Sequence, residues 1–196
     1  MDKTPLLPEP AMVTAALSRD GLHSKGVAIS ERAALAIYDI QARRGLAADV
    51  ARLIEEKYSI ELPEANRCVT RHSLLTCCAG PNHWLMIEFS GNDPGSLYDL
   101  KECLADKASV FDQSGAFTII KAEGRFVPQA LAKGIHLDLD PSVFGPGSAA
   151  VTSIAHIGVM FWKSDDRPSF EFAIPRSLVM GFVDWLHEAS LEFGAP

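Results

Sequence analysis

Four cysteines are the first residues in this sequence whose types could carry chemistry, either as metal ligands or as disulfide partners. They are Cys68, Cys77, Cys78 and Cys103. Cys77 and Cys78 are adjacent in a predicted strand, where successive side chains point to opposite faces and cannot jointly hold one tetrahedral ion. No Cys-x-x-Cys or His-x-x-x-His spacing occurs. The pattern favours reduced thiols buried in the core.

Histidines beside hydroxyls or turns could act in nucleophilic catalysis. His72 precedes Ser73, but neighbours in a strand face opposite ways, and the sequence has no Gly-x-Ser-x-Gly elbow. His83 stands beside Trp84 after a predicted turn. His156 falls inside an apolar strand, where a hydrogen-bonded core or interface residue is expected. None of these histidines is predicted to be catalytic.

Carboxylates at short spacing are the remaining reactive groups. Asp138 and Asp140 would share one face of an extended chain, a geometry that suits acid–base work or ion binding. Asp140 before Pro141 is also typical of a helix N-cap followed by proline. The run Asp112-Gln113-Ser114 falls at a predicted hairpin, where such side chains close turns. Cap and turn roles are favoured, so the sequence offers no catalytic, cofactor-binding or metal-binding residue.

Three large aromatic residues, Trp84, Phe144 and Trp162, lie at or near the ends of predicted elements. At such positions aromatic side chains serve either as core residues or as anchors of an interface with another protein. The sequence leaves both roles open.

Hydrophobic spacing defines the elements that position these residues. Two hairpins are expected, 68–78 with 83–89 around the turn at 79–82, and 109–113 with 117–123 around Ser114-Gly115. One or two strands are expected within 27–40, an unbroken strand apolar on both faces over 151–163, and a half-buried strand over 170–174. Helices are expected at 46–57 and 96–107, between Pro128 and Gly134, and after Asp140. The order predicts an α+β fold with helices on one face of a mostly antiparallel sheet.

The clearest predicted element is the last helix, which Ser177 would cap. Trp185 is central to its apolar stripe, and its replacement by alanine should cost several kcal/mol, since burying a large side chain contributes roughly 1.5–3 kcal/mol. The stripe comprises Leu178, Phe182, Trp185, Leu186, Ala189 and Phe193.

Composition and charge narrow the class of protein. The 196 residues, of which 47% are hydrophobic, suit one α+β domain over 26–196 after an extended N-terminal arm over 1–25. A net charge of −7 argues against nucleic acid as a partner, because phosphate binding needs a basic surface. The longest apolar run, 149–162, is short of a membrane span, and the first residues lack a secretory signal. We therefore expect a cytoplasmic protein.

Several ordered motifs resemble the gamma subunits of heterotetrameric sarcosine oxidases, over roughly residues 27–193. That family is similar in fold to the T-protein/TrmE-type folate-binding domain. The motifs are Cys-Ala-Gly-Pro-Asn-His-Trp-Leu-Met-Ile at 78–87, Phe-Asp-Gln-Ser at 111–114, Leu-Ala-Lys-Gly at 131–134 followed by Leu-Asp-Leu-Asp at 137–140 and Phe144, Gly147 with Thr152, and Arg176-Ser177 with Trp185-Leu186.

The resemblance implies a non-catalytic structural subunit of a four-subunit flavin enzyme. Such an enzyme converts sarcosine, oxygen and water to glycine, hydrogen peroxide and formaldehyde, or methylene-tetrahydrofolate when tetrahydrofolate is present. The implied partners are alpha, beta and delta subunits. FAD, covalent FMN, NAD and tetrahydrofolate belong to these partners, with zinc on the delta subunit, and this chain holds no cofactor.

Two alternatives stay open at this point. One is a subunit of a related N-methylglutamate dehydrogenase. The other is a stand-alone folate-dependent C1-transfer protein, motivated by Asp112-Gln113-Ser114 and by the fold similarity.

Overall fold

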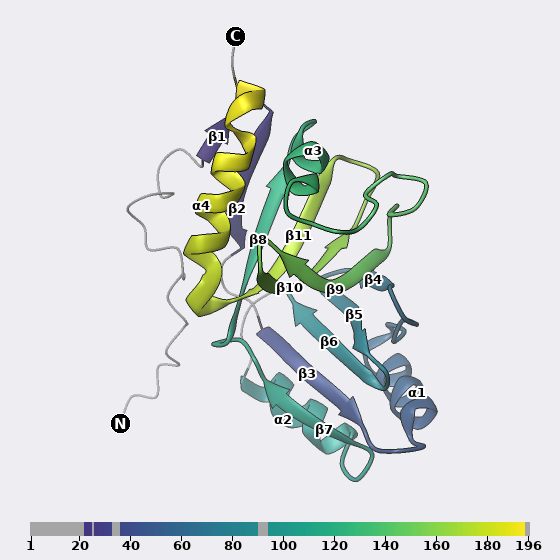
Figure 1. Ribbon diagram of the computed structural model, residues 1–196. Helices are drawn as coiled ribbons and strands as arrows, with labels where there is room; N and C mark the ends of the chain where they lie inside the picture. The colour runs from purple at the N-terminus through teal and green to yellow at the C-terminus, as the bar shows by residue number, and fades with distance from the viewer. Residues whose placement is uncertain (1–21, 25, 33–35, 90–93, 195–196) are drawn as a thin grey trace, which may run out of the picture.

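The computed structural model describes residues 22–24, 26–32, 36–89 and 94–194, and this part of the chain holds eleven strands in two antiparallel sheets (Figure 1). The six-stranded sheet runs β1 (Leu22–Ser24), β2 (Val27–Arg32), β8 (Phe117–Glu123), β11 (Ser169–Pro175), β10 (Ile157–Lys163) and β9 (Ser148–Ile154). The five-stranded sheet runs β4 (Cys68–Arg71), β5 (Leu74–Gly80), β6 (His83–Glu88), β3 (Ala36–Ala42) and β7 (Ala108–Asp112).

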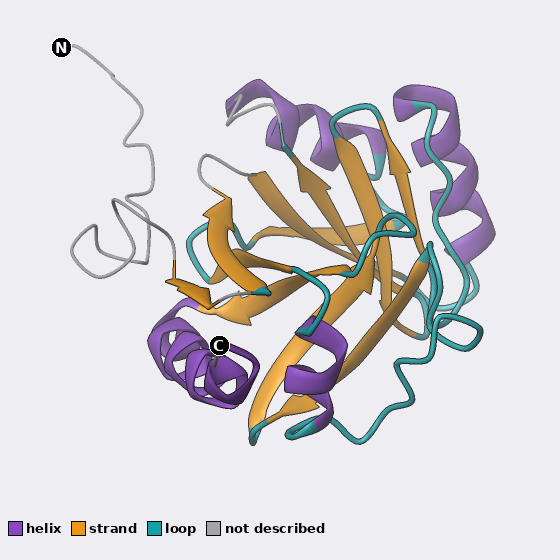
Figure 2. Ribbon diagram, turned by 90° about the horizontal axis from the view of Figure 1, so that it is seen from above, coloured by secondary structure: helices purple, strands orange, loops and turns teal. Residues whose placement is uncertain are grey.

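Helices cover the outer face of each sheet, and Figure 2 shows them at the periphery with the strands between. Two lie against the five-stranded sheet, and two lie against the six-stranded sheet. No helix in the described ranges is long and apolar enough to cross a membrane. The four α-helices are α1 (Ala47–Tyr58), α2 (Pro94–Cys103), α3 (Val127–Ala132) and α4 (Val179–Ser190), and the short 3₁₀ turns are η1 (Arg176–Leu178) and η2 (Leu191–Gly194).

Three hydrophobic clusters follow from this layering. One lies between the six-stranded sheet and helices α3 and α4, and another between the five-stranded sheet and helices α1 and α2. The third lies between the two sheets, where Ile37 and Leu85 from one sheet meet Met160 and Trp162 from the other. The α+β fold with antiparallel sheets is confirmed, but its helices cover two sheets rather than one face of a single sheet.

The helices illustrate how local sequence produces local structure. In α1, Val50 and Ile54 lie four residues apart on one face and are fully buried. The helix ends at Ser59, whose backbone has φ 55° and whose N–H bonds the carbonyl of Glu55. Pro128 falls in the first turn of α3, as the sequence predicts.

The hairpin around the turn at 79–82 is confirmed, since β5 and β6 pair there, but its first strand is shorter than predicted, and the second predicted hairpin is wrong. The segment 68–78 is itself a hairpin, with β4 and β5 joined at His72 and Ser73, and β5 pairs in turn with β6. Strand β7 pairs with β3, whereas β8 pairs with β2 and β11, so the turn around Ser114 crosses from one sheet to the other. Turn residues at Ser114-Gly115 predict a reversal correctly but do not reveal which sheet receives the next strand.

Three further predictions in the C-terminal half are wrong. The stretch 151–163 is two strands, because Ala155 and His156 both take positive φ in a two-residue turn. Residues after Asp140 form a turn rather than a helix. Ser177 is not a cap, since α4 begins at Val179 after a 3₁₀ turn.

Burial also departs from two expectations. Strand β11 is buried on both faces rather than half-buried, because sheet–sheet packing covers the face that carries Glu171 and Ala173. In the last helix Leu178 is exposed, while Phe182 and Leu186 are buried as predicted. The predicted arm over 1–25 lies outside the described residues apart from 22–24, which form β1. That 26–196 is one domain stays a prediction.

Candidate functional site

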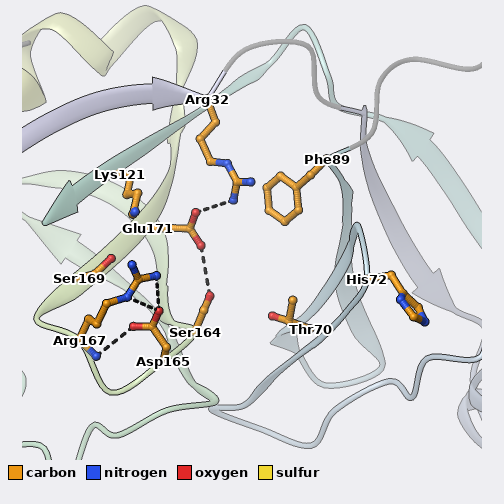
Figure 3. Close-up of a pocket in the computed structure, with 10 residues that line it drawn as sticks. All are labelled: Arg32, Thr70, His72, Phe89, Lys121, Ser164, Asp165, Arg167, Ser169 and Glu171. Atoms are coloured by element: carbon orange, nitrogen blue, oxygen red, sulfur yellow. Dashed lines mark hydrogen bonds and ion pairs between the residues drawn. The ribbon is translucent and has the colours of Figure 1, made fainter.

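A cavity opens between the two sheets. It has a volume of about 380 Å³. Adjacent strands β2, β8 and β11 contribute Arg32, Lys121 and Glu171 to one wall. The β4–β5 hairpin contributes Thr70, and Phe89 follows β6 on the opposite wall (Figure 3). We call this cavity the inter-sheet cleft.

A buried carboxylate organises the floor of the inter-sheet cleft. The side chain of Glu171 is only 9% exposed and has three hydrogen-bond donors. Arg32 Nη1 lies 2.6 Å from Glu171 Oε1, Trp162 Nε1 donates to Oε2 at 2.9 Å, and Ser164 Oγ donates to Oε2 at 3.2 Å. A buried charge needs this degree of pairing, because desolvation of an unpaired carboxylate is very costly.

The Arg32 guanidinium is held in place from two directions. Its central carbon lies 3.7 Å from the centroid of the Phe89 ring, within the range of a cation–π contact. Its Nη1 is fixed by Glu171. A planar, always charged group held this way presents its remaining N–H donors in a defined direction.

The other charges around the inter-sheet cleft form local pairs. Lys121 Nζ lies 2.5 Å from Glu123 Oε2, and Arg167 contacts Asp165 through both Nε and Nη2. The hydrogen bonds from the Arg167 side chain hold the pKa of Asp165 below its ordinary value. Lys163 donates to the carbonyls of Asp165 and Arg167, which shapes the loop at the rim.

A second group of polar side chains lies on strands β3 and β6 of the five-stranded sheet. His83 Nε2 lies 2.9 Å from Asp39 Oδ2, and Gln41 Nε2 donates to Asp39 Oδ1 at 3.0 Å. Asp39 therefore orients the His83 ring. In the described part of the chain no serine or cysteine is hydrogen-bonded to this imidazole, so no Ser–His or Cys–His pair forms there.

Of the four cysteines, Cys68 and Cys77 are buried, and Cys78 and Cys103 are partly buried. Cys77 faces the cluster between the sheets, and Cys78 packs on the side of helices α1 and α2, so their side chains point to opposite faces as predicted. Cys68 pairs with Cys77 across strands β4 and β5. Burial raises the pKa of the Cys77 thiol, while the hydrogen bond with Cys77 lowers the pKa of Cys68. All four cysteines are free thiols.

The candidate carboxylates are engaged in turns. Asp138 Oδ1 accepts the backbone N–H of Asp140, and Asp140 Oδ1 accepts both the N–H and the hydroxyl of Ser142. These hydrogen bonds from Ser142 lower the pKa of Asp140. Asp112 Oδ1 likewise accepts from the N–H and hydroxyl of Ser114. No group of three or more His, Cys, Asp or Glu side chains in the described ranges could hold a metal ion.

The remaining candidate histidines lie in turns, whereas the three candidate aromatic residues lie in the core. His72 lies in the β4–β5 turn at the rim of the inter-sheet cleft, and His156 is exposed in the β9–β10 turn, not inside a strand. Trp84, Phe144 and Trp162 are all core residues. Trp84 Nε1 donates to the carbonyl of Pro63, and the Phe144 ring stacks on Phe161 with centroids 4.7 Å apart.

Sequence reasoning missed the two residues that organise the inter-sheet cleft. Glu171 alternates with apolar neighbours in β11, which indicates a solvent-facing position, and Arg32 lies 139 residues away. A single charge within residues 170–175, which are otherwise all apolar, was the available signal.

The two antiparallel sheets and their outer helices define a known class of fold. The glycine cleavage system aminomethyltransferase T from Bartonella henselae shares it with a TM-score of 0.59 and 10% identity, over 84% of this chain and 46% of that one. At that identity the likeness concerns the fold alone. The chain itself belongs to the sarcosine oxidase gamma subunit family, whose model matches residues 44–192.

Curated and solved relatives agree with this assignment. The sarcosine oxidase subunit gamma of Arthrobacter sp. is 29% identical over 119 residues, covering 60% of this chain and 57% of that one. The subunit from Corynebacterium sp. strain P-1 is 30% identical over 118 residues, or 59% and 56%. These alignments span little more than half the length of each curated relative. A chain of heterotetrameric sarcosine oxidase from Corynebacterium sp. U-96 matches with a TM-score of 0.78 and 25% identity, over 89% and 88% of the two chains.

Proposed function

We propose that this chain is a non-catalytic structural subunit of a four-subunit, flavin-dependent sarcosine oxidase. The observation that carries the proposal is the near full-length correspondence with a chain of a heterotetrameric sarcosine oxidase, at a TM-score of 0.78. The complex would convert sarcosine, oxygen and water to glycine, hydrogen peroxide and formaldehyde, or form methylene-tetrahydrofolate when tetrahydrofolate is present.

The non-catalytic role is supported by what the candidate residues do in the fold. Asp112, Asp138 and Asp140 accept hydrogen bonds within their own turns, and Cys77 is buried between the sheets. Groups committed to turns and cores are not free to bind a substrate. FAD, FMN, NAD, zinc and the folate would then be held by the alpha, beta and delta partners, in the cytoplasm.

Exposed apolar side chains support a subunit role. Tyr98, Val143 and Val151 are each at least 60% exposed, and Phe111 is 50% exposed on the edge strand β7. Obligate interfaces bury such residues over areas on the order of 2,000 Å² or more. We expect part of this surface to be covered by the alpha or beta subunit.

Co-expression tests the proposal. A tagged copy of this chain is purified alone and together with the three partner subunits from the same genome. We expect a yellow complex of four different chains that produces hydrogen peroxide from sarcosine, and no such activity from the chain alone. A chain that remains a well-behaved monomer and binds none of the partners would contradict the proposal.

A second experiment separates the structural role from a catalytic one. The complex is assembled with Asp112→Asn, His83→Gln or Asp138→Asn in this chain. Each variant should keep kcat and KM for sarcosine within about twofold, because none of these groups would contact the reacting atoms. A loss of kcat without loss of assembly would assign catalysis to this chain.

Calorimetric titration of the chain with tetrahydrofolate should show no binding. That result would distinguish this chain from a folate-dependent C1-transfer protein.

A further inference from the structure

We propose that the inter-sheet cleft is a binding site for one small carboxylate ligand. This inference goes beyond the structural role proposed above and does not depend on it. It rests on an imbalance between hydrogen-bond donors and acceptors in the cleft, on the way Arg32 is held, and on the cavity's size.

The acceptors of the cleft are committed. Glu171 already accepts from Arg32, Trp162 and Ser164. Asp165 accepts from the backbone N–H, Nε and Nη2 of Arg167. Little acceptor capacity is left for a ligand that would donate hydrogen bonds.

The donors, in contrast, are in surplus. Among the described residues, the Arg32 guanidinium is hydrogen-bonded only through Nη1, which leaves Nη2 and Nε available. Lys121 Nζ has three N–H donors and one carboxylate partner, Glu123. The hydroxyls of Thr70 and Ser169 also line the cleft (Figure 3). The hydroxyls can donate or accept, but a ligand that satisfies Arg32 and Lys121 must bring acceptor oxygens.

The chemistry favours a carboxylate over a phosphate. The free edge of a guanidinium matches the two oxygens of a carboxylate, and its contacts with Phe89 and Glu171 fix that edge before binding. A phosphate dianion would bring one more negative charge than a carboxylate into a cleft that already holds Glu171 and Asp165. The 380 Å³ volume lies within the roughly 300–1,000 Å³ range of small-molecule sites.

The indole N–H of Trp162 is a built-in reporter for this site. It donates to Glu171, the same carboxylate that anchors Arg32, whereas the indole of Trp84 donates to Pro63 on the far side of the five-stranded sheet. The full chain labelled with ¹⁵N gives three indole signals, assigned with Trp→Phe variants at 84, 162 and 185. Sodium propionate is the probe, and neutral propionamide is its isosteric control.

We expect propionate to shift the Trp162 signal with a saturable one-to-one curve, while the Trp84 signal stays in place. Propionamide, and sodium chloride at matched ionic strength, should leave both unchanged. A Trp162 response that is equal for chloride and propionate, or no saturable response at all, would overturn the proposal. A stronger response to inorganic phosphate than to propionate would overturn the assignment to carboxylates.

Two variants locate the binding groups. Lys121→Gln and Arg32→Lys should each weaken propionate binding roughly tenfold, the effect of losing one charge-assisted hydrogen bond. Arg32→Lys keeps a positive charge beside Glu171 but removes the planar guanidinium. It therefore tests the two-donor contact with the ligand rather than the ion pair with Glu171. Lys101→Gln, on the exposed side of α2, is the matched control and should bind as the unmodified chain does. Unchanged affinity in both cleft variants would contradict the site; Thr70→Val offers the same test if Arg32→Lys fails to fold.

Discussion

At the scale of single residues, the buried polar groups divide into those with partners and those without. Glu171 has three donors, whereas the hydroxyl oxygen of Tyr58 and Oγ1 of Thr118 are buried without a hydrogen-bond partner in the described structure. A buried group without a partner loses its hydration and gains nothing in return. The two kinds of group should respond in opposite ways to substitution.

Removing the hydroxyl of Tyr58 should be harmless or favourable. Burial raises the pKa of Tyr58 well above its ordinary value of about 10. The unfolded chain therefore loses this proton first, and the contribution to stability declines as pH rises above about 10. Tyr58→Phe should leave the free energy of unfolding at pH 7 unchanged or raise it by up to about 1 kcal/mol.

Urea unfolding at pH 7 and at pH 10.5 measures both effects. Tyr98→Phe is the control, because Tyr98 is 68% exposed. A loss of stability at neutral pH as large as that of an average core truncation would show that the Tyr58 hydroxyl has a hydrogen-bond partner.

Glu171 should behave in the opposite way. Glu171→Ala leaves Arg32 without its anion and Trp162 without its acceptor, which should cost about 3–5 kcal/mol in unfolding free energy. Glu171→Gln keeps an oxygen for the indole and should cost less, about 1–3 kcal/mol. Glu56→Gln removes a solvent-exposed pair with Arg52 and should leave the urea midpoint within error. If the Glu171 and Glu56 substitutions changed the unfolding free energy equally, the hydrogen bonds of Glu171 would not stabilise the floor of the inter-sheet cleft.

At the scale of elements, the contact between α3 and α4 depends on a missing side chain. Gly134 follows α3, and a Cβ atom there would lie 2.4 Å from Trp185 Cζ2 in α4. The Trp185 ring also lies 6.1 Å, centroid to centroid, from Phe182. Close approach of backbone to indole is therefore the reason for glycine at this position.

Gly134→Ala should destabilise the protein by about 1–3 kcal/mol, the usual cost of overpacking. Gly158→Ala is the control, since a Cβ there meets nothing within 4 Å. The double variant with Trp185→Phe should recover part of the loss, because the smaller ring leaves room for the methyl group. Additive losses in the double variant, measured by thermal unfolding, would mean that the two residues do not share this contact.

Elements also show where prediction from sequence ends. Helices α1 and α3 were predictable, because hydrophobic periodicity and a proline in the first turn are local signals. The turns at His72 and at Ala155 were not, because neither has the Gly or Asn usual at positive φ. The burial of Glu171 was missed for another reason: alternation in a strand shows which residues share a face, but not that a second sheet covers that face.

At the scale of the whole molecule, the cluster between the sheets bears on the number of domains. It joins Ile37, Leu75 and Leu85 of one sheet to Ile119 and Trp162 of the other. We propose on this ground that the chain unfolds as one cooperative unit, as a single domain over 26–196 would.

The three tryptophans test that proposal because each reports on a different cluster. Trp84 belongs to the cluster under α1 and α2, Trp162 to the one between the sheets, and Trp185 packs against the one under α3 and α4. Three variants that each keep one tryptophan should each give a single urea transition by fluorescence. In each variant this transition should coincide with the loss of secondary structure measured on the same variant. A Trp84 transition separate from that of Trp185 would show two units.

The order of strands along the chain sets an order of folding events. All strands of the five-stranded sheet come from residues 36–112, which lie between β2 and β8 in the sequence. Strands β2 and β8 pair with each other, with Ala28 opposite Glu123. Hairpins such as β5–β6 close short loops, whereas β2 and β8 must close one of about 90 residues, at a larger entropic cost. Amide protons of β5 and β6 should therefore become protected from solvent exchange during refolding before those of β2. During synthesis on the ribosome, β2 cannot pair with β8 until the five-stranded sheet between them in the sequence has been synthesised.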